Sequence, residues 1–330
     1  MKTCAIFLTL LLAAPVFAQT KQIDFLQVGR NYTNLFYDGK SADIWMNLSP
    51  EMKKVFGEPD GILGMHLQMK KQFGDEAEAI DEKVMFQGEV IQYQRLVRFQ
   101  KDPAAMMVQW SFDRNGVIVG FYVRPVAAAE SHFLDYKDKV ALRLPFKGSW
   151  LVLAGGRSVS ENQHAGTVDQ RFAYDLTAIR HGRVFFGDGT RPEQYFCFGQ
   201  PILAPGAGTV VAANDGIPDN PINAPFDSPP AGNLVVIDFG NSEYSFLAHL
   251  KLGSVRVKVG DKVQQGQRIG KCGSSGDATV PHLHIHLQDT PILFKGEGLP
   301  IQFQSYTAGK QFVSAGEPVR GQTIRNKNKK

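Results

Sequence analysis

Three histidines, His282, His284 and His286, lie within the heptapeptide 281–287, which reads PHLHIHL. In a β-strand, successive side chains point to opposite faces. The three imidazoles would therefore share one face of a strand, and the aliphatic side chains between them would share the other. Imidazole is the commonest neutral metal ligand, and a histidine beside a ligand can act as an acid or a base. The heptapeptide predicts a strand that carries a metal site on one face.

Two further stretches offer ligands and proton carriers for the same site. His164 precedes an alternating run, 171–177, in which Asp175 points away from the apolar face. The apolar strand expected at 244–250 ends with His249 and a leucine. Imidazole and carboxylate groups are ligands for zinc, and histidine is the side chain that most often carries protons in catalysis. We therefore expect these stretches to converge on the histidine-rich strand.

The composition is that of an ordinary globular protein with many turns. The chain has 330 residues, of which 43% are apolar and 21% charged, with 33 Gly and 18 Pro. This length favours two domains. The net charge of +4 and pI near 8.8 would suit an anionic polymer of the cell envelope as partner.

The first domain is expected over 19–125, as an α+β unit. A helix with one buried stripe ends near Gly39, and shorter helices follow at 49–56 and 62–73. Strands are predicted at 83–99, 105–112 and 117–124, with a hairpin turn at 113–116. The order of helices and then strands resembles that of cone-shaped, nuclear-transport-factor-like domains.

The second domain is expected over 146–310, after a linker at 126–145, as an all-β antiparallel sheet or sandwich. The segment 214–232 contains five prolines and is expected to be a long loop. Residues 311–330 are expected to form a C-terminal extension with a solvated basic tail. Strands are predicted at 148–154, 171–177, 201–212, 233–239, 244–250, 255–259, 267–271 and 282–288.

Residues 1–18 have the features of a secretory signal: a lysine near the start, a short apolar stretch and a small-residue cleavage site. No stretch is long and apolar enough for a transmembrane helix. We therefore expect an exported protein, periplasmic or extracellular and associated with the cell wall. In an oxidising compartment, Cys197 and Cys272 are expected to form a disulfide, in preference to two buried free thiols.

The second domain resembles the lysostaphin-like (LytM-type) zinc metallopeptidases, which cut peptide cross-links in bacterial cell walls. Five motif segments carry the resemblance, and they occur in the order found in that family. The resemblance implies an antiparallel, β-rich domain with an open groove. The five segments are 201–210 (PILAPGAGTV), 248–250 (AHL), 260–263 (GDKV), 266–270 (GQRIG) and 281–284 (PHLH).

The resemblance also implies a zinc ion held by a histidine, an aspartate and the second histidine of the His-x-His pair. Carried over by position, the last of these ligands is His284, and two nearby helper histidines are His282 and His249. The first ligand is expected to be His164. The family usually places its aspartate four residues after this histidine, whereas here Asp169 follows by five residues and Asp175 by eleven. Asp175 is preferred because it lies in a predicted strand.

The function implied by the resemblance is that of an exported zinc metalloendopeptidase. It would hydrolyse peptide bonds of peptidoglycan cross-links or stem peptides by metal-activated water, because three protein ligands leave a fourth position open. His282 or His249 would take the proton of the water. His286 is expected to be an exposed strand residue, in preference to an outer contact of the metal site.

Two other functions are open on the sequence. The second domain could be a non-catalytic relative that binds and activates another cell-wall hydrolase, or it could be a zinc peptidase for protein substrates. We expect peptidoglycan peptides as partners and no nucleic acid. The N-terminal domain is a candidate site for a protein partner.

Overall fold

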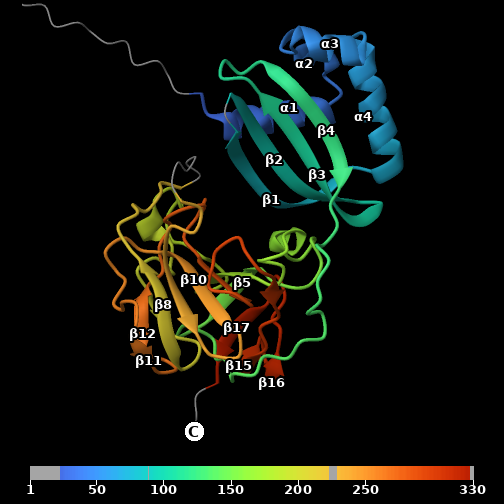
Figure 1. The fold of residues 1–330 in the computed structure, drawn as a ribbon. Coiled ribbons are helices and arrows are strands. Elements are labelled where there is room, and N and C mark those ends of the chain that lie inside the picture. Colours follow the sequence, from blue (N-terminus) through green and yellow to red (C-terminus); the bar gives the residue numbers. More distant parts are fainter. Residues whose placement is uncertain (1–22, 88, 223–228, 328–330) are drawn as a thin grey trace, which may run out of the picture.

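The computed structural model of the protein describes residues 23–87, 89–222 and 229–327 (Figure 1). The expected signal, 1–18, lies outside these residues. Two separate hydrophobic cores are present, one built from residues 25–123 and the other from residues 133–324. Among the described residues, no helix has the length and apolar character needed to cross a membrane.

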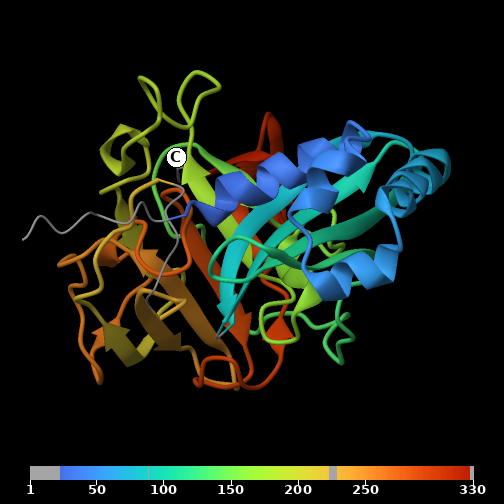
Figure 2. The same ribbon diagram turned by 90° about the horizontal axis from the view of Figure 1, so that it is seen from above.

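The first part of the chain forms four helices and then a four-stranded antiparallel sheet in the order β1-β2-β3-β4. Helix α1 lies across the strands in Figure 2, and its buried Thr33 accepts a hydrogen bond from Trp110 at 3.0 Å. The α+β organisation is confirmed, whereas the likeness to nuclear-transport-factor-like domains stays a prediction. The elements are α1 (Phe25–Tyr37), α2 (Ser41–Met46), α3 (Pro50–Phe56), α4 (Pro59–Phe73), β1 (Glu76–Gln87), β2 (Val90–Phe99), β3 (Asp102–Phe112) and β4 (Ile118–Pro125).

The strand predicted at 83–99 is wrong, because this segment contains parts of two paired strands, β1 and β2. The β-branched and aromatic residues continue through both strands and hid the reversal between them. The beginning of β1 was missed for a different reason. Its first residues are rich in Glu and Ala, which are depleted in strands.

The outer face of the first sheet carries an apolar patch that packs against the second part of the chain. Along β2, side chains alternate, so that Val97 enters the first core while Leu96 points to the other face. Leu96 packs there with Ala165 and Val159 from the second part of the chain. The two parts therefore share a small third cluster of buried residues.

The second part forms an antiparallel sheet of eleven strands. Its order is β11-β8-β9-β10-β13-β6-β5-β17-β15-β16, with β14 paired to β13. The all-β prediction is confirmed, and β13 lies between β10 and β6. The strands are β5 (Trp150–Ala154), β6 (Tyr174–Ala178), β8 (Gly208–Asn214), β9 (Asn233–Asp238), β10 (Tyr244–Leu250), β11 (Lys262–Val263), β13 (Leu283–Gln288), β14 (Gly298–Leu299), β15 (Phe303–Ala308), β16 (Gln311–Gly316) and β17 (Thr323–Asn326).

Smaller elements connect this sheet. A separate two-stranded sheet pairs β7 (Pro201–Leu203) with β12 (Arg268–Lys271), so the strand predicted at 201–212 is divided into β7 and β8. The described residues include the 3-10 turns η1 (Gln163–Gly166) and η2 (Pro192–Gln194). The strand predicted at 255–259 is wrong. Its valines, Val255 and Val257, pack against the core, but the segment forms no strand ladder.

The C-terminal extension expected at 311–330 is corrected by the sheet topology. Strand β17 pairs with β5 on one side and β15 on the other, and β16 pairs with β15. Ile324 is fully buried opposite Trp150. The basic residues around it suggested a solvated tail, but pairing on both sides and the buried side chain of Ile324 place this strand in the sheet.

Residues 126–145, expected as a linker, contain no helix or strand but are fixed along the second part of the chain. Ala129 donates its backbone N–H to the carbonyl of Ala165 at 2.7 Å. Leu142 and Leu144 are buried in the second core. Glu243, itself fully buried, accepts hydrogen bonds from the side chain of Tyr136 and from the backbone of 139.

The expected disulfide is not formed in this structure, where Cys197 and Cys272 are buried free thiols. The thiol of Cys197 instead donates a hydrogen bond to the carbonyl oxygen of Pro281 at 3.1 Å. Burial raises the pKa of Cys272 well above its usual range. Both thiols therefore act as packing groups beneath the loop that leads into β13.

The place of β17 in the sheet can be tested by stability. We expect Ile324→Ala to lower the free energy of unfolding by about 2–5 kcal/mol, because it leaves a cavity in the core. Arg325→Ala, on the exposed face of the same strand, should cost less than about 1 kcal/mol. Denaturant titration followed by circular dichroism measures both. Equal, small effects would show that the end of the chain does not belong to the sheet.

Candidate metal and catalytic centre

The central strand β13 places the histidines as the alternation predicted. Leu283, Ile285 and Leu287 are fully buried in the second core, while His284 and His286 lie on the opposite face. The register of the sheet sets His284 directly opposite Asp175 on β6 and opposite Ala248 on β10. Side chains opposite each other in an antiparallel pair lie on the same face at close range. Strand register alone therefore brings the aspartate to the histidine.

His164 reaches the same point from the 3-10 turn η1. Its Nε2 atom lies 2.8 Å from Oδ2 of Asp175, and Nδ1 of His284 lies 3.0 Å from Oδ1. The candidate ligand atoms of these three residues all lie within 4.8 Å of one another. The structure therefore brings together the three residues expected to be ligands.

The turn that carries His164 is held by Asn162, which is fully buried. The side-chain oxygen of Asn162 accepts from the backbone N–H of His164 at 3.1 Å. Its amide nitrogen donates to three carbonyls, including that of Ala173 just before β6, also at 3.1 Å. This asparagine ties the turn to the strand of Asp175, which explains how ligands eleven residues apart meet.

Gln163 was not identified from the sequence, although it contacts the site. Its side-chain amide donates to Oδ2 of Asp175 at 2.8 Å. Asp169, the alternative aspartate, is outside the cluster. Its Oδ2 atom is buried and makes no hydrogen bond in the described part of the chain.

The two helper histidines flank the cluster. The rings of His249 and His282 are 4.7 Å apart, and the ring of His249 is 5.7 Å from that of His284. Nε2 of His282 lies 3.6 Å from Oδ1 of Asp175. All five candidate residues from the sequence therefore meet at one end of β13.

The position of His249 depends on a β-bulge. Strict alternation after Leu247, which faces the core, would turn residue 249 toward the core as well. The register between β9 and β10 shifts between Leu247 and Leu250, and His249 adopts a positive φ of 56°. A bulge re-aims a side chain. Here it turns the imidazole toward His282 and the pocket.

The carbonyl groups around the helper histidines determine where their protons lie. Nδ1 of His249 faces the carbonyl oxygen of Ser275 at 2.8 Å, and Nδ1 of His282 faces that of Val280 at 2.8 Å. A carbonyl oxygen only accepts, so each Nδ1 atom carries a proton. A neutral imidazole then has its lone pair on Nε2. Both rings can accept a proton at that atom.

The electrostatics of the cluster favour an ionised carboxylate at Asp175. Burial acts to raise the pKa of Asp175, but the neighbouring histidines, with His164 and His282 first, hold it well below its usual range. Burial lowers the pKa of His284, and burial with the charges of His282 and His284 lowers the pKa of His249 well below its usual value. At His164, burial is outweighed by Asp175, which raises the pKa.

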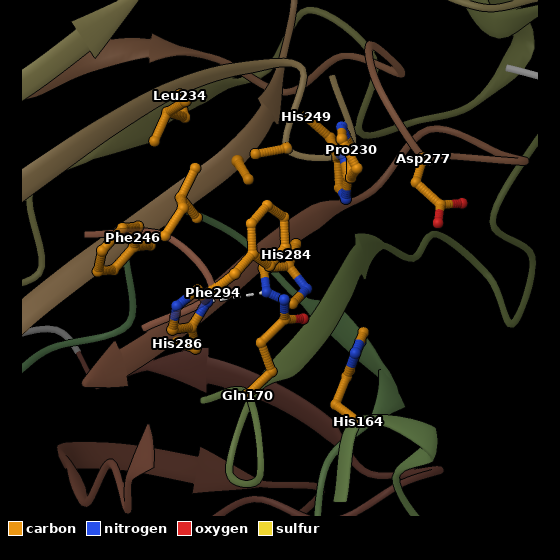
Figure 3. A pocket seen from close by; sticks show the side chains of 13 residues that line it. His164, Gln170, Pro230, Leu234, Phe246, His249, Asp277, His284, His286 and Phe294 are labelled. Atoms are coloured by element: carbon orange, nitrogen blue, oxygen red, sulfur yellow. Dashed lines mark hydrogen bonds between the residues drawn. The ribbon is translucent and has the colours of Figure 1, made fainter. Parts of the chain in front are cut away.

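His286 corrects the expectation of an exposed strand residue, because it is only 2% exposed. Its Nδ1 atom lies 3.0 Å from Nε2 of His284, the contact drawn as a dashed line in Figure 3. On the other side, Nε2 lies 3.0 Å from Oε1 of Gln288. The ring stacks on Phe246 with centroids 4.6 Å apart. The sequence of one strand could not show that Phe246 of β10 covers this position.

A pocket of about 100 Å³ opens onto the cluster (Figure 3). His164, His249 and His284 line it together with Asp277, whose pKa burial raises to about 6. Phe294 and Leu293 also line the pocket. The pocket gives a small ligand group access to the cluster.

The donor set fits a zinc ion. Two imidazole nitrogens and a carboxylate oxygen face one another at a largely buried point, and these are donors that zinc accepts. A buried carboxylate is costly unless a positive charge pairs with it. His164, Asp175 and His284 would hold the ion, and the pocket, which His249 also lines, would give a further ligand access to it.

Comparison with known proteins locates the similarity in the second domain. Residues 194–296 match the family described as Peptidase family M23. This segment includes His249, His282 and His284, whereas His164 and Asp175 precede it. Their place in the site is therefore supported by the geometry of η1 and β6 alone.

Two similar proteins are peptidoglycan DD-endopeptidases of Vibrio cholerae. ShyA is 41% identical over 90 residues, covering 27% of this chain and 19% of that protein. ShyC is 36% identical over 86 residues, covering 26% of this chain and 18% of that protein. The chain thus spans about a fifth of the length of these curated relatives. A structure of a zinc-containing peptidase from Vibrio cholerae covers 64% of this chain and 56% of its own, at 18% identity and a TM-score of 0.31.

The choice between the two aspartates can be tested by metal binding. We expect Asp175→Asn to lose bound zinc after dialysis, because the charged donor of the cluster is removed. Asp169→Asn serves as the matched control and should retain one zinc ion per chain. Elemental analysis of the purified proteins measures both. Zinc retained by the Asp175 variant and lost by the Asp169 variant would reverse the assignment.

Proposed function

We propose that this protein is an exported zinc-dependent endopeptidase that hydrolyses peptide bonds in peptidoglycan cross-links or stem peptides. One observation carries the proposal. A cluster of three metal-type donors lies beside two histidines whose Nε2 atoms are free to accept a proton. The match of residues 194–296 to Peptidase family M23 and the similarity to peptidoglycan DD-endopeptidases support it.

In the proposed site, His164, Asp175 and His284 hold the metal. A bound zinc ion supplies a Lewis acid that polarises a peptide carbonyl and makes water more acidic. His249 and His282 accept a proton at Nε2, because their Nδ1 atoms are tied to backbone carbonyls. The low pKa of His249 keeps its ring neutral, which is the form that can act as a base. The same rings can later return the proton to the leaving amine.

The proposal extends to location and partners. The expected secretory signal at 1–18 and the cell-wall substrate agree with a periplasmic or extracellular protein. The substrate is a peptide of the wall, and no nucleic-acid partner is proposed. The first domain is left as the candidate surface for a protein partner.

The roles of the histidines predict different losses. We expect His284→Ala to abolish both zinc retention and cleavage, because it removes a ligand. His282→Ala should retain zinc and lose about 100-fold or more in rate, because only a proton carrier is removed. His132→Ala changes an exposed histidine that pairs with Glu297 and lies outside the candidate metal cluster; it is the control and should keep both properties. Full hydrolysis by the His284 variant would rule out the proposed site.

The reaction itself is tested by digestion of purified peptidoglycan with and without a chelator. We expect cleaved muropeptides from the untreated protein, no products after zinc removal, and recovery when zinc is returned. Mass spectrometry of the products identifies the bond. Stoichiometric zinc without cleavage of peptidoglycan would instead favour a non-catalytic role in binding another hydrolase. Cleavage of a protein substrate alone would favour the second alternative.

A further inference from the structure

Behind the candidate ligand His284, a buried row of hydrogen-bonded side chains runs through His286 to Gln288. Gln288 is fully buried at the end of β13. Its side-chain nitrogen lies 2.7, 2.9 and 3.1 Å from the carbonyl oxygens of Thr290, Ile292 and Lys295. An amide oxygen in that place would face three acceptors with no proton to share. The loop 290–295 therefore fixes the amide with its nitrogen toward the loop and its oxygen toward His286.

This orientation determines where His286 carries its proton. Oε1 of Gln288 can only accept, so Nε2 of His286, 3.0 Å away, must donate. A neutral ring that donates from Nε2 has its lone pair on Nδ1, the atom that faces Nε2 of His284 at 3.0 Å.

The same reasoning applies to the candidate ligand His284. The lone pair on Nδ1 of His286 requires a donor at 3.0 Å, and Nε2 of His284 is the atom that faces it. With its proton on Nε2, the neutral ring of His284 has its lone pair on Nδ1. That atom lies 3.0 Å from the carboxylate oxygen of Asp175. Two acceptor atoms thus face each other, an arrangement that a cation between or beside them relieves.

We propose that Gln288 and His286 are positioning residues that fix the proton of His284 on Nε2 and so keep its Nδ1 atom available as a ligand. Without this row of hydrogen-bonded side chains, Asp175 would favour a proton on Nδ1 of His284, because a hydrogen bond to a carboxylate is stronger than one between neutral groups. That proton would have to leave before a metal could bind. The proposal rests on the metal site of the proposed function, but it does not depend on which bond the enzyme cuts.

The effect of His286 on the proton of His284 can be separated from its packing by the choice of substitution. Phe246 holds the ring of His286 by stacking, with an angle of 8° between the planes. A phenylalanine at position 286 would keep this stacking but offer no acceptor. A glutamine there could accept a hydrogen bond from His284 and donate one to Gln288, which preserves the direction of the hydrogen bonds in the row. The two substitutions therefore separate packing from proton placement.

The experiment compares His286→Phe and His286→Gln in the full chain. We expect His286→Phe to weaken zinc binding by about 10–100-fold, since outer contacts of metal-bound histidines typically contribute that much. His286→Gln should keep most of the affinity. Competition with a chromogenic chelator measures affinity, and thermal unfolding of the metal-free proteins checks the fold. Equal zinc affinity of the two folded variants would overturn the proposal.

A second measurement observes the protons directly and stays informative if a variant fails to fold. In histidine-labelled wild-type protein loaded with zinc, the nitrogen resonances of the rings report which atom is protonated. We expect protons on Nε2 of both His284 and His286. A proton on Nδ1 of His286 would overturn the proposal. Neither readout requires peptidoglycan cleavage, so failure of the peptidase proposal and failure of this inference are distinguishable.

Discussion

The candidate site of the second domain depends on one buried carboxylate. Asp175 is about 6% exposed, and an unpaired negative charge at such a position would be strongly destabilising. His164, His282 and His284 surround it from three different segments of the chain. Without the carboxylate, the three imidazole rings would lose the negative charge that they surround. The need to satisfy this charge therefore explains why histidines from three segments gather at this point of the sheet.

The two faces of the antiparallel sheet have different roles around this carboxylate. One face of β13 carries only aliphatic side chains into the core, so the strand is fixed regardless of what its other face does. The opposite face is then free to hold a continuous polar row of histidines that ends at Gln288. The departures from regular strand geometry occur where a group must be turned, as at the bulge that directs His249 into the pocket.

Simple alternation was sufficient to predict the parts of the site that lie on regular strands. The shared face of the histidines and the outward direction of Asp175 both follow from a period of two. The direction of His249 could not be predicted in this way, because it depends on a bulge. Gln163 and Gln288 have no pattern of their own, since an amide in a loop or at a strand end becomes important only through its partners.

The errors in the fold have similar causes. The burial of His286 depends on Phe246 of a neighbouring strand, and no property of its own strand revealed that this side chain would cover it. The end of the chain was expected to be solvated because its composition is basic, yet β17 pairs with a strand on each side and buries Ile324. A pair of cysteines in a protein expected to be exported suggested a disulfide, whereas both are buried free thiols in this structure.

The small cluster between the two parts of the chain has a consequence for work with fragments. Ala165 is fully buried against Leu96 of the first sheet, and it follows His164 directly. A fragment that begins after the first domain would expose Ala165 and Val159 to water and leave the turn of a candidate ligand without its neighbour. Such a fragment differs from the intact protein at the candidate metal site itself. Its activity would therefore report two changes at once: the loss of a domain and the loosening of a ligand.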